Sequence, residues 1–132
     1  MPATLLLIDD NAIQAATRQA ILKRGGYFVI VTLNPERALD QLRSGELAAP
    51  VDLIITDHIM PGMNGLEFVA HVREFAPELP VLVISGLAEA EEEYGHLNVH
   101  FRLKPVMPDY LLSTVRDLLN GVGSSSEPSL PN

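Results

Sequence analysis

The chain has 132 residues, the usual length of one domain, and its 47% hydrophobic and 20% charged residues exclude wholesale disorder. It has no cysteine, which excludes disulfides, thiolate catalysis and cysteine-based metal sites. A net charge of -8 would repel phosphate backbones, so we expect no direct nucleic-acid partner. No apolar run is long enough to span a membrane, and no basic stretch precedes the first one as in a signal peptide. We therefore expect a cytoplasmic protein with no membrane partner.

The chain begins with a predicted strand and helix. Residues 4–8 are continuously apolar, which is typical of a strand buried on both faces of a sheet. Asn11 then opens a predicted helix that ends at Gly25. The apolar side chains at helical spacing in this segment are Ile13, Ala16, Ala20 and Ile21.

The middle of the chain repeats the alternation. A weaker strand is expected at residues 28–31, followed by a helix that Asn34 caps and that ends before Gly45. Residues 51–55 form the second strongly apolar run, and Asn64 caps a third predicted helix. Each apolar run thus leads into a helix.

The C-terminal third predicts two more strands. Residues 80–84 are strongly apolar and residues 99–103 less so, with a polar, irregular helix over residues 88–94 between them. The last helix opens at Pro108. Residues 122–132 are rich in serine and proline, which predicts a flexible tail too short to form a domain.

Five strands alternating with five helices predict an α/β fold with a parallel sheet. Ligands of such sheets bind at the carboxyl ends of the strands. The strand ends carry Asp9, Asp10, Asp57 and Ser85, and Lys104 follows the fifth strand. We therefore expect these five side chains at one rim of the sheet.

Clustered carboxylates repel one another, by about 4 kcal/mol for two charges 4 Å apart at an effective dielectric constant near 20. A hard divalent cation offsets this repulsion, and carboxylate, carbonyl and water are the ligands that Mg²⁺ prefers. A hydroxyl and an ammonium group beside a metal suit phosphoryl oxygens, and an ionised carboxylate is a nucleophile. The pattern indicates a site of phosphoryl transfer.

Four motifs carry a resemblance to a known family. They are Ile8-Asp9-Asp10, the run from Asp57 to Gly65, Ser85-Gly86, and the run from Phe101 to Pro105. In this order and at these separations, the chain from Thr4 to Leu119 resembles the receiver domain of bacterial two-component response regulators. The resemblance implies a flavodoxin-like, doubly wound sheet of strand order 2-1-3-4-5, with a receiver domain at residues 1–121 and a tail at 122–132.

The resemblance also assigns roles around Mg²⁺. Asp57 matches the phosphoacceptor, and with Asp10 it would bind the metal directly. The backbone carbonyl of Ile59 would complete the protein's ligands, and Asp9 would act through water. Lys104 matches the lysine that binds the phosphoryl group, and a cis peptide bond is expected before Pro105.

Ser85 and Phe101 match the switch hydroxyl and the switch aromatic residue of the family. The expected partners are a sensor histidine kinase or a histidine phosphotransfer protein, together with an unknown downstream protein. The chain would catalyse only its own phosphorylation and dephosphorylation, so we do not expect it to be an enzyme. Ile59 and Leu87 match positions beside the route of hydrolytic water. The alternative function is a receiver-fold adaptor that works without phosphorylation.

Overall fold

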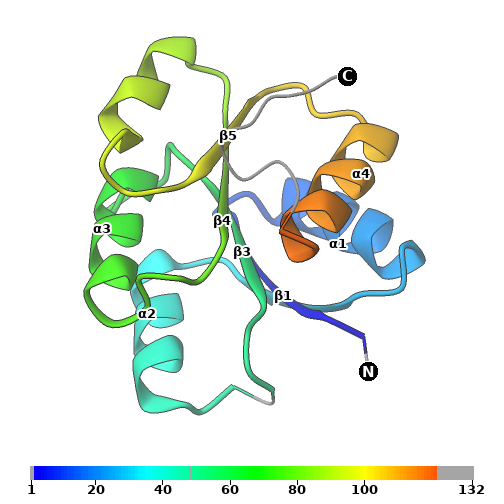
Figure 1. Cartoon of the computed structure of the whole chain (residues 1–132), viewed down its shortest axis with the longest axis horizontal. Helices are drawn as coiled ribbons and strands as arrows, with labels where there is room; N and C mark the ends of the chain where they lie inside the picture. Colours follow the sequence, from blue (N-terminus) through cyan, green and yellow to red (C-terminus); the bar gives the residue numbers. More distant parts are fainter. Residues whose placement is uncertain (1, 48, 122–132) are drawn as a thin grey trace.

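A computed structural model describes residues 2–47 and 49–121, which fold around one parallel sheet of five strands in the order β2-β1-β3-β4-β5 (Figure 1). The strands are β1 (Thr4–Ile8), β2 (Phe28–Thr32), β3 (Leu53–Asp57), β4 (Val81–Ser85) and β5 (His100–Leu103). The helices are α1 (Ala12–Arg24), α2 (Pro35–Ser44), α3 (Gly65–Phe75), the 3₁₀ helix η1 (Ala88–Tyr94) and α4 (Pro108–Leu119). The predicted fold class and strand order are confirmed. The predicted tail at 122–132 lies outside the described residues.

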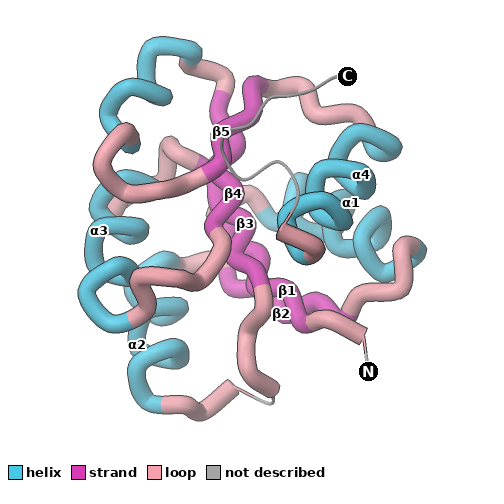
Figure 2. Tube along the Cα trace, in the orientation of Figure 1, coloured by secondary structure: helices cyan, strands magenta, loops and turns pink. Residues whose placement is uncertain are grey.

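Helices cover both faces of the sheet. In Figures 1 and 2, α2, α3 and η1 lie on one side of the strands, and α1 and α4 lie on the other. Leu6 and Ile8 of β1 belong to the core on the first side, whereas Leu5 and Leu7 belong to the core on the second. This alternation explains why β1 is apolar at successive positions.

Asparagine side chains fix the start of three helices, as the sequence predicts. The side chains of Asn11, Asn34 and Asn64 each accept a hydrogen bond from a backbone N–H of the first helical turn, at 2.9–3.0 Å. These bonds satisfy donors that have no partner within the helix. The caps of α1 and α3 matter for the site, because α1 begins just after Asp9 and Asp10, and α3 is the helix that follows β3, the strand ending in Asp57.

The fourth helical segment is a 3₁₀ helix instead of an α-helix. Only Ala90 and Tyr94 within it are buried, and its start at Leu87 has no side-chain cap. One small and one aromatic residue give the segment little apolar surface with which to hold a regular helix against the sheet. The following strand begins at His100, one residue later than expected.

The buried face of α1 differs from the apolar positions that predicted it. Ile13 is 80% exposed, and the buried residues of the helix are Ala15 and Leu22. Arg18 lies between them at a spacing of three and four residues, so it lies on the inward face of the helix, and its side chain is only 13% exposed. Within the described residues, no helix is both long and apolar enough to cross a membrane.

Candidate phosphoryl-transfer site

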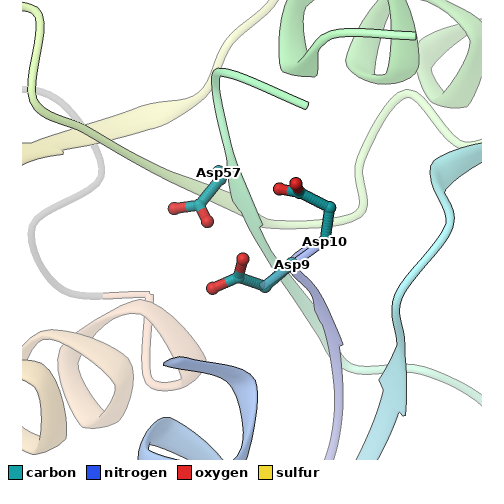
Figure 3. A group of neighbouring side chains, drawn as sticks. All are labelled: Asp9, Asp10 and Asp57. Carbon is teal, nitrogen blue, oxygen red and sulfur yellow. The ribbon is translucent and has the colours of Figure 1, made fainter. Parts of the chain in front are cut away.

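Three aspartates meet at the carboxyl end of the sheet, as expected. Asp57 is the last residue of β3, and Asp9 and Asp10 follow β1, the strand paired with it. One carboxylate oxygen from each lies within 4.8 Å of the others (Figure 3). Asp9 and Asp57 are buried, whereas Asp10 is exposed. The cluster thus has two carboxylates embedded in the protein and one open to solvent.

Two cations contact Asp57 on the same oxygen. Nζ of Lys104 lies 3.3 Å from Oδ1 of Asp57, and Nη1 of Arg18 lies 3.2 Å from it. Nη1 of Arg18 also donates to Oδ2 of Asp9 at 3.1 Å. Gln14 accepts hydrogen bonds from both cations, at 3.3 Å from Lys104 and 3.4 Å from Arg18. The carboxylates and the cations form one connected network.

Arg18 and Gln14 are site residues that the sequence reasoning did not find. The available signal is limited to α1 itself, where Gln14 and Arg18 lie four residues apart and shortly after Asp9 and Asp10. Residues four apart in a helix share a face, so Gln14 and Arg18 lie on the same side of α1. The apolar residues that predict α1, beginning with Ile13, do not indicate that this polar pair faces the site.

Burial raises the pKa of Asp9 to about 6. The hydrogen bond and the negative charge of Asp57 act in the same direction, while the N–H of Asn11 and the guanidinium of Arg18 oppose them. The N–H of Asn11 donates to Oδ1 of Asp9 at 2.9 Å. Asp9 is therefore held on both oxygens, by a backbone amide and by an arginine.

Ser85 and Phe101 lie on the neighbouring strands. The hydroxyl of Ser85, at the end of β4, is buried and accepts a hydrogen bond from the N–H of Leu87 at 3.0 Å. Phe101 of β5 is 8% exposed, and its ring centroid lies 6.1 Å from that of Tyr94. Ser85 is thus bonded to Leu87, which precedes η1, and Phe101 contacts Tyr94 of η1. The side chain of Lys104 contacts Asp57 instead.

The segment after Asp57 is tied to η1 by a buried hydrogen bond. Nδ1 of His58 lies 2.6 Å from the hydroxyl of Tyr94, and burial raises the pKa of that hydroxyl, so it stays protonated. A Cβ on Gly65 would stand 2.5 Å from the carbonyl oxygen of Asp57 and 2.7 Å from the Tyr94 hydroxyl. Only glycine allows α3 to begin this close to the end of β3.

Two other expected features can be located. The peptide bond between Lys104 and Pro105 is cis, as predicted. Ile59 and Leu87 are 64% and 41% exposed, so both side chains reach solvent. The structure therefore places apolar side chains at the surface two residues after Asp57 and two residues after Ser85.

Residues 5–116 match the family model of the response regulator receiver domain. Over 92% of its length, the chain is 35% identical to a hydrogenase transcriptional regulatory protein, HoxA, of Cupriavidus necator, and it spans 25% of that relative. It is 35% identical to the two-component response regulator ORR6 of Oryza sativa, covering 79% of this chain and 64% of the relative.

Solved structures agree with the family match. The chemotaxis protein CheY4 of Vibrio cholerae superposes with a TM-score of 0.79 at 28% identity, over 88% of this chain and 98% of that one. A putative response regulator of Chloroflexus aurantiacus gives 0.81 at 28% identity, over 91% and 99%. The chain belongs to the response regulator receiver family.

Proposed function

We propose that this chain is a signalling switch in which Asp57 accepts a phosphoryl group. The observation that carries the proposal is the pairing of one buried carboxylate oxygen, Oδ1 of Asp57, with two cations beside two further aspartates. A carboxylate held this way is fixed in orientation and surrounded by groups that stabilise developing negative charge. Membership of the receiver family supports the same function.

In the proposed step, an oxygen of Asp57 attacks the phosphorus of a phosphohistidine. A P–O bond forms, the P–N bond of the donor breaks, and the donor leaves as a neutral imidazole that keeps the proton already on its other ring nitrogen. Lys104, already 3.3 Å from Asp57, would neutralise the phosphoryl oxygens during transfer. The chain would catalyse only this reaction and the later hydrolysis, so its role is that of a switch and not of an enzyme with separate substrates.

The donor set suits Mg²⁺. Asp10 and Asp57 would bind the metal directly, the backbone carbonyl of Ile59 would add a third oxygen, and Asp9 would act through water. Three carboxylates within 4.8 Å of one another, one of them exposed, provide hard oxygen ligands with room for water. Once bound, Mg²⁺ would offset the negative charge that the carboxylates and the phosphoryl oxygens bring together.

The switch would run from Ser85 to Phe101. Phosphorylation adds a charge of about -1.5 to -2 and new hydrogen-bond acceptors at Asp57. The Ser85 hydroxyl, now bonded by the N–H of Leu87, would turn toward the phosphoryl group. The loop at Leu87 leads into η1, which carries Tyr94 against Phe101, so this movement would change the surface formed by η1 and β5.

The expected partners are a sensor histidine kinase or a histidine phosphotransfer protein, and an unknown downstream protein. Residues 1–121 would form the receiver domain, working in the cytoplasm. HoxA is named as a transcriptional regulator, but this chain spans only a quarter of it. Because the chain carries a net charge of -8, we propose that it makes no direct contact with nucleic acid itself.

Intact-mass analysis tests the function against the adaptor alternative. The full chain would be incubated with a small acyl phosphate, with and without Mg²⁺. We expect one phosphoryl group per chain, gained only with the metal and lost in Asp57→Asn. No mass gain with any donor would overturn the proposal and favour an adaptor that works without phosphorylation.

A further inference from the structure

Arg18 lies on the inward face of α1, where an apolar side chain would be expected. Its neighbours on the inward face, Ala15 and Leu22, are 1% and 0% exposed. An arginine placed there must leave water, which is unfavourable unless its charge is paired. The helix therefore carries a largely covered cation, and the contacts of that cation explain its position.

The contacts of Arg18 lie on the two buried carboxylates. Nη1 reaches Oδ2 of Asp9 at 3.1 Å and Oδ1 of Asp57 at 3.2 Å, so a single nitrogen bridges the pair. Lys104, the other cation, contacts Asp57 and is 35% exposed, compared with 13% for Arg18. Arg18 is thus the more deeply held of the two and the one that contacts both carboxylates.

We infer that Arg18 is a resident counter-cation of this site, which competes with Mg²⁺ for the charge of Asp9 and Asp57. This inference rests on the proposed metal-dependent function and goes beyond it, because it states that Arg18 of α1 lowers the affinity of the site for Mg²⁺. The guanidinium partly neutralises the pair, so part of the attraction for a divalent cation is already satisfied. Metal binding must then overcome repulsion from Arg18 or displace it.

The competition has a direction that experiment can measure. Removing the positive charge of Arg18 leaves two buried carboxylates without that partner and increases the negative potential at the rim. The Mg²⁺ affinity should therefore rise, by about tenfold or more at moderate salt, because charges a few ångströms apart inside a protein are poorly screened. The metal-free protein should become less stable in the same variant.

The test is a titration of the full chain with Mg²⁺ at constant ionic strength, without a phosphodonor. Calorimetry or amide NMR shifts would give the dissociation constant for wild type, Arg18→Met and a control, Arg24→Met. Arg24 lies in the same helix but is exposed at its far end, so Arg24→Met changes the net charge equally without touching the site. Tighter binding in Arg18→Met alone supports the inference.

Equal or weaker binding in a folded Arg18→Met protein overturns it, and so does an equal gain in Arg24→Met. If Arg18→Met does not fold, Arg18→Gln takes its place. A second measurement needs no variant, since the guanidinium N–H signals of Arg18 in the wild type should shift as the metal is added. Signals that stay unchanged at saturating Mg²⁺ count against competition.

Failure of this inference is distinct from failure of the proposed function. Equal affinities, with Mg²⁺-dependent phosphorylation of Asp57 intact, would remove only the role of Arg18. An absence of Mg²⁺ binding in both wild type and Arg18→Met would overturn the metal site and the inference together.

Discussion

Tyr94→Phe isolates the buried hydrogen bond that joins the segment after Asp57 to η1. The hydroxyl of Tyr94 lies 2.6 Å from Nδ1 of His58, and the two residues are 2% and 8% exposed. Phenylalanine keeps the ring and its edge-to-face contact with His58, where the ring centroids are 5.5 Å apart. The substitution therefore removes one hydroxyl and little packing.

The expected loss of stability follows from this burial. A buried polar atom that loses its partner retains its desolvation penalty, which amounts to about 1–3 kcal/mol. The Nδ1 atom of His58 would be that atom. We expect Tyr94→Phe to lower the free energy of unfolding by about this amount, because water has little access to a histidine so well covered.

Urea unfolding followed by circular dichroism measures the change. Tyr110→Phe is the matched control, since Tyr110 is 49% exposed and should lose little with its hydroxyl. A change in Tyr94→Phe no larger than that of the control, within about 0.5 kcal/mol, would refute the reasoning. It would mean that the His58–Tyr94 contact does not stabilise the fold.

Three further predictions concern the switch, hydrolysis and pH. Lys104→Ala should leave phosphorylation of Asp57 possible but reduce the NMR shift changes around Phe101 on adding a phosphoryl mimic; a full wild-type pattern would contradict this. Ile59→Asn combined with Leu87→Glu should speed loss of the phosphoryl group about tenfold to a hundredfold by positioning water, and equal decay rates at constant Mg²⁺ would show that these side chains do not control hydrolysis. Burial, together with the charges of two nearby arginines, lowers the pKa of His100 below its usual value of 6.5. The unfolded state therefore binds a proton at His100 more readily than the folded state, and the free energy of unfolding falls as the pH drops below about 6.5. His100→Gln should remove this pH dependence. In urea unfolding at a series of pH values, the free energy of unfolding of wild type minus that of His100→Gln should fall as the pH falls. A difference that stays constant would refute the prediction.

The strands and the aspartates were predictable for physical reasons. A strand buried on both faces must be apolar at every position, as residues 4–8 are, and a parallel sheet brings its carboxyl ends to one edge. The positions of Asp9, Asp10 and Asp57 follow from these two facts. The asparagine caps were predictable because the helix start leaves backbone donors without partners.

The role of Arg18 was not predictable from apolar spacing. The apolar series that predicts α1 begins at Ile13, which is 80% exposed, whereas the inward face of the helix carries Ala15 and Leu22. The inward face also contains an arginine, whose burial depends on carboxylates from two strands. Such a residue is recognised only when the sheet and the helix are seen together. The bond between His58 and Tyr94 likewise joins residues 36 positions apart.

The cations that contact Asp57 and the aromatic residues that pack beside η1 lie on opposite sides of the sheet. Arg18 and Lys104 gather on the α1 side of Asp57, whereas Tyr94 and Phe101 pack into the core shared with α2 and α3. Asp57 ends the central strand, β3, and lies between the two groups. Genetic screens should therefore separate substitutions of Arg18, which change the phosphorylation chemistry, from substitutions of Tyr94 or Phe101, which leave phosphorylation normal but block recognition by the downstream protein.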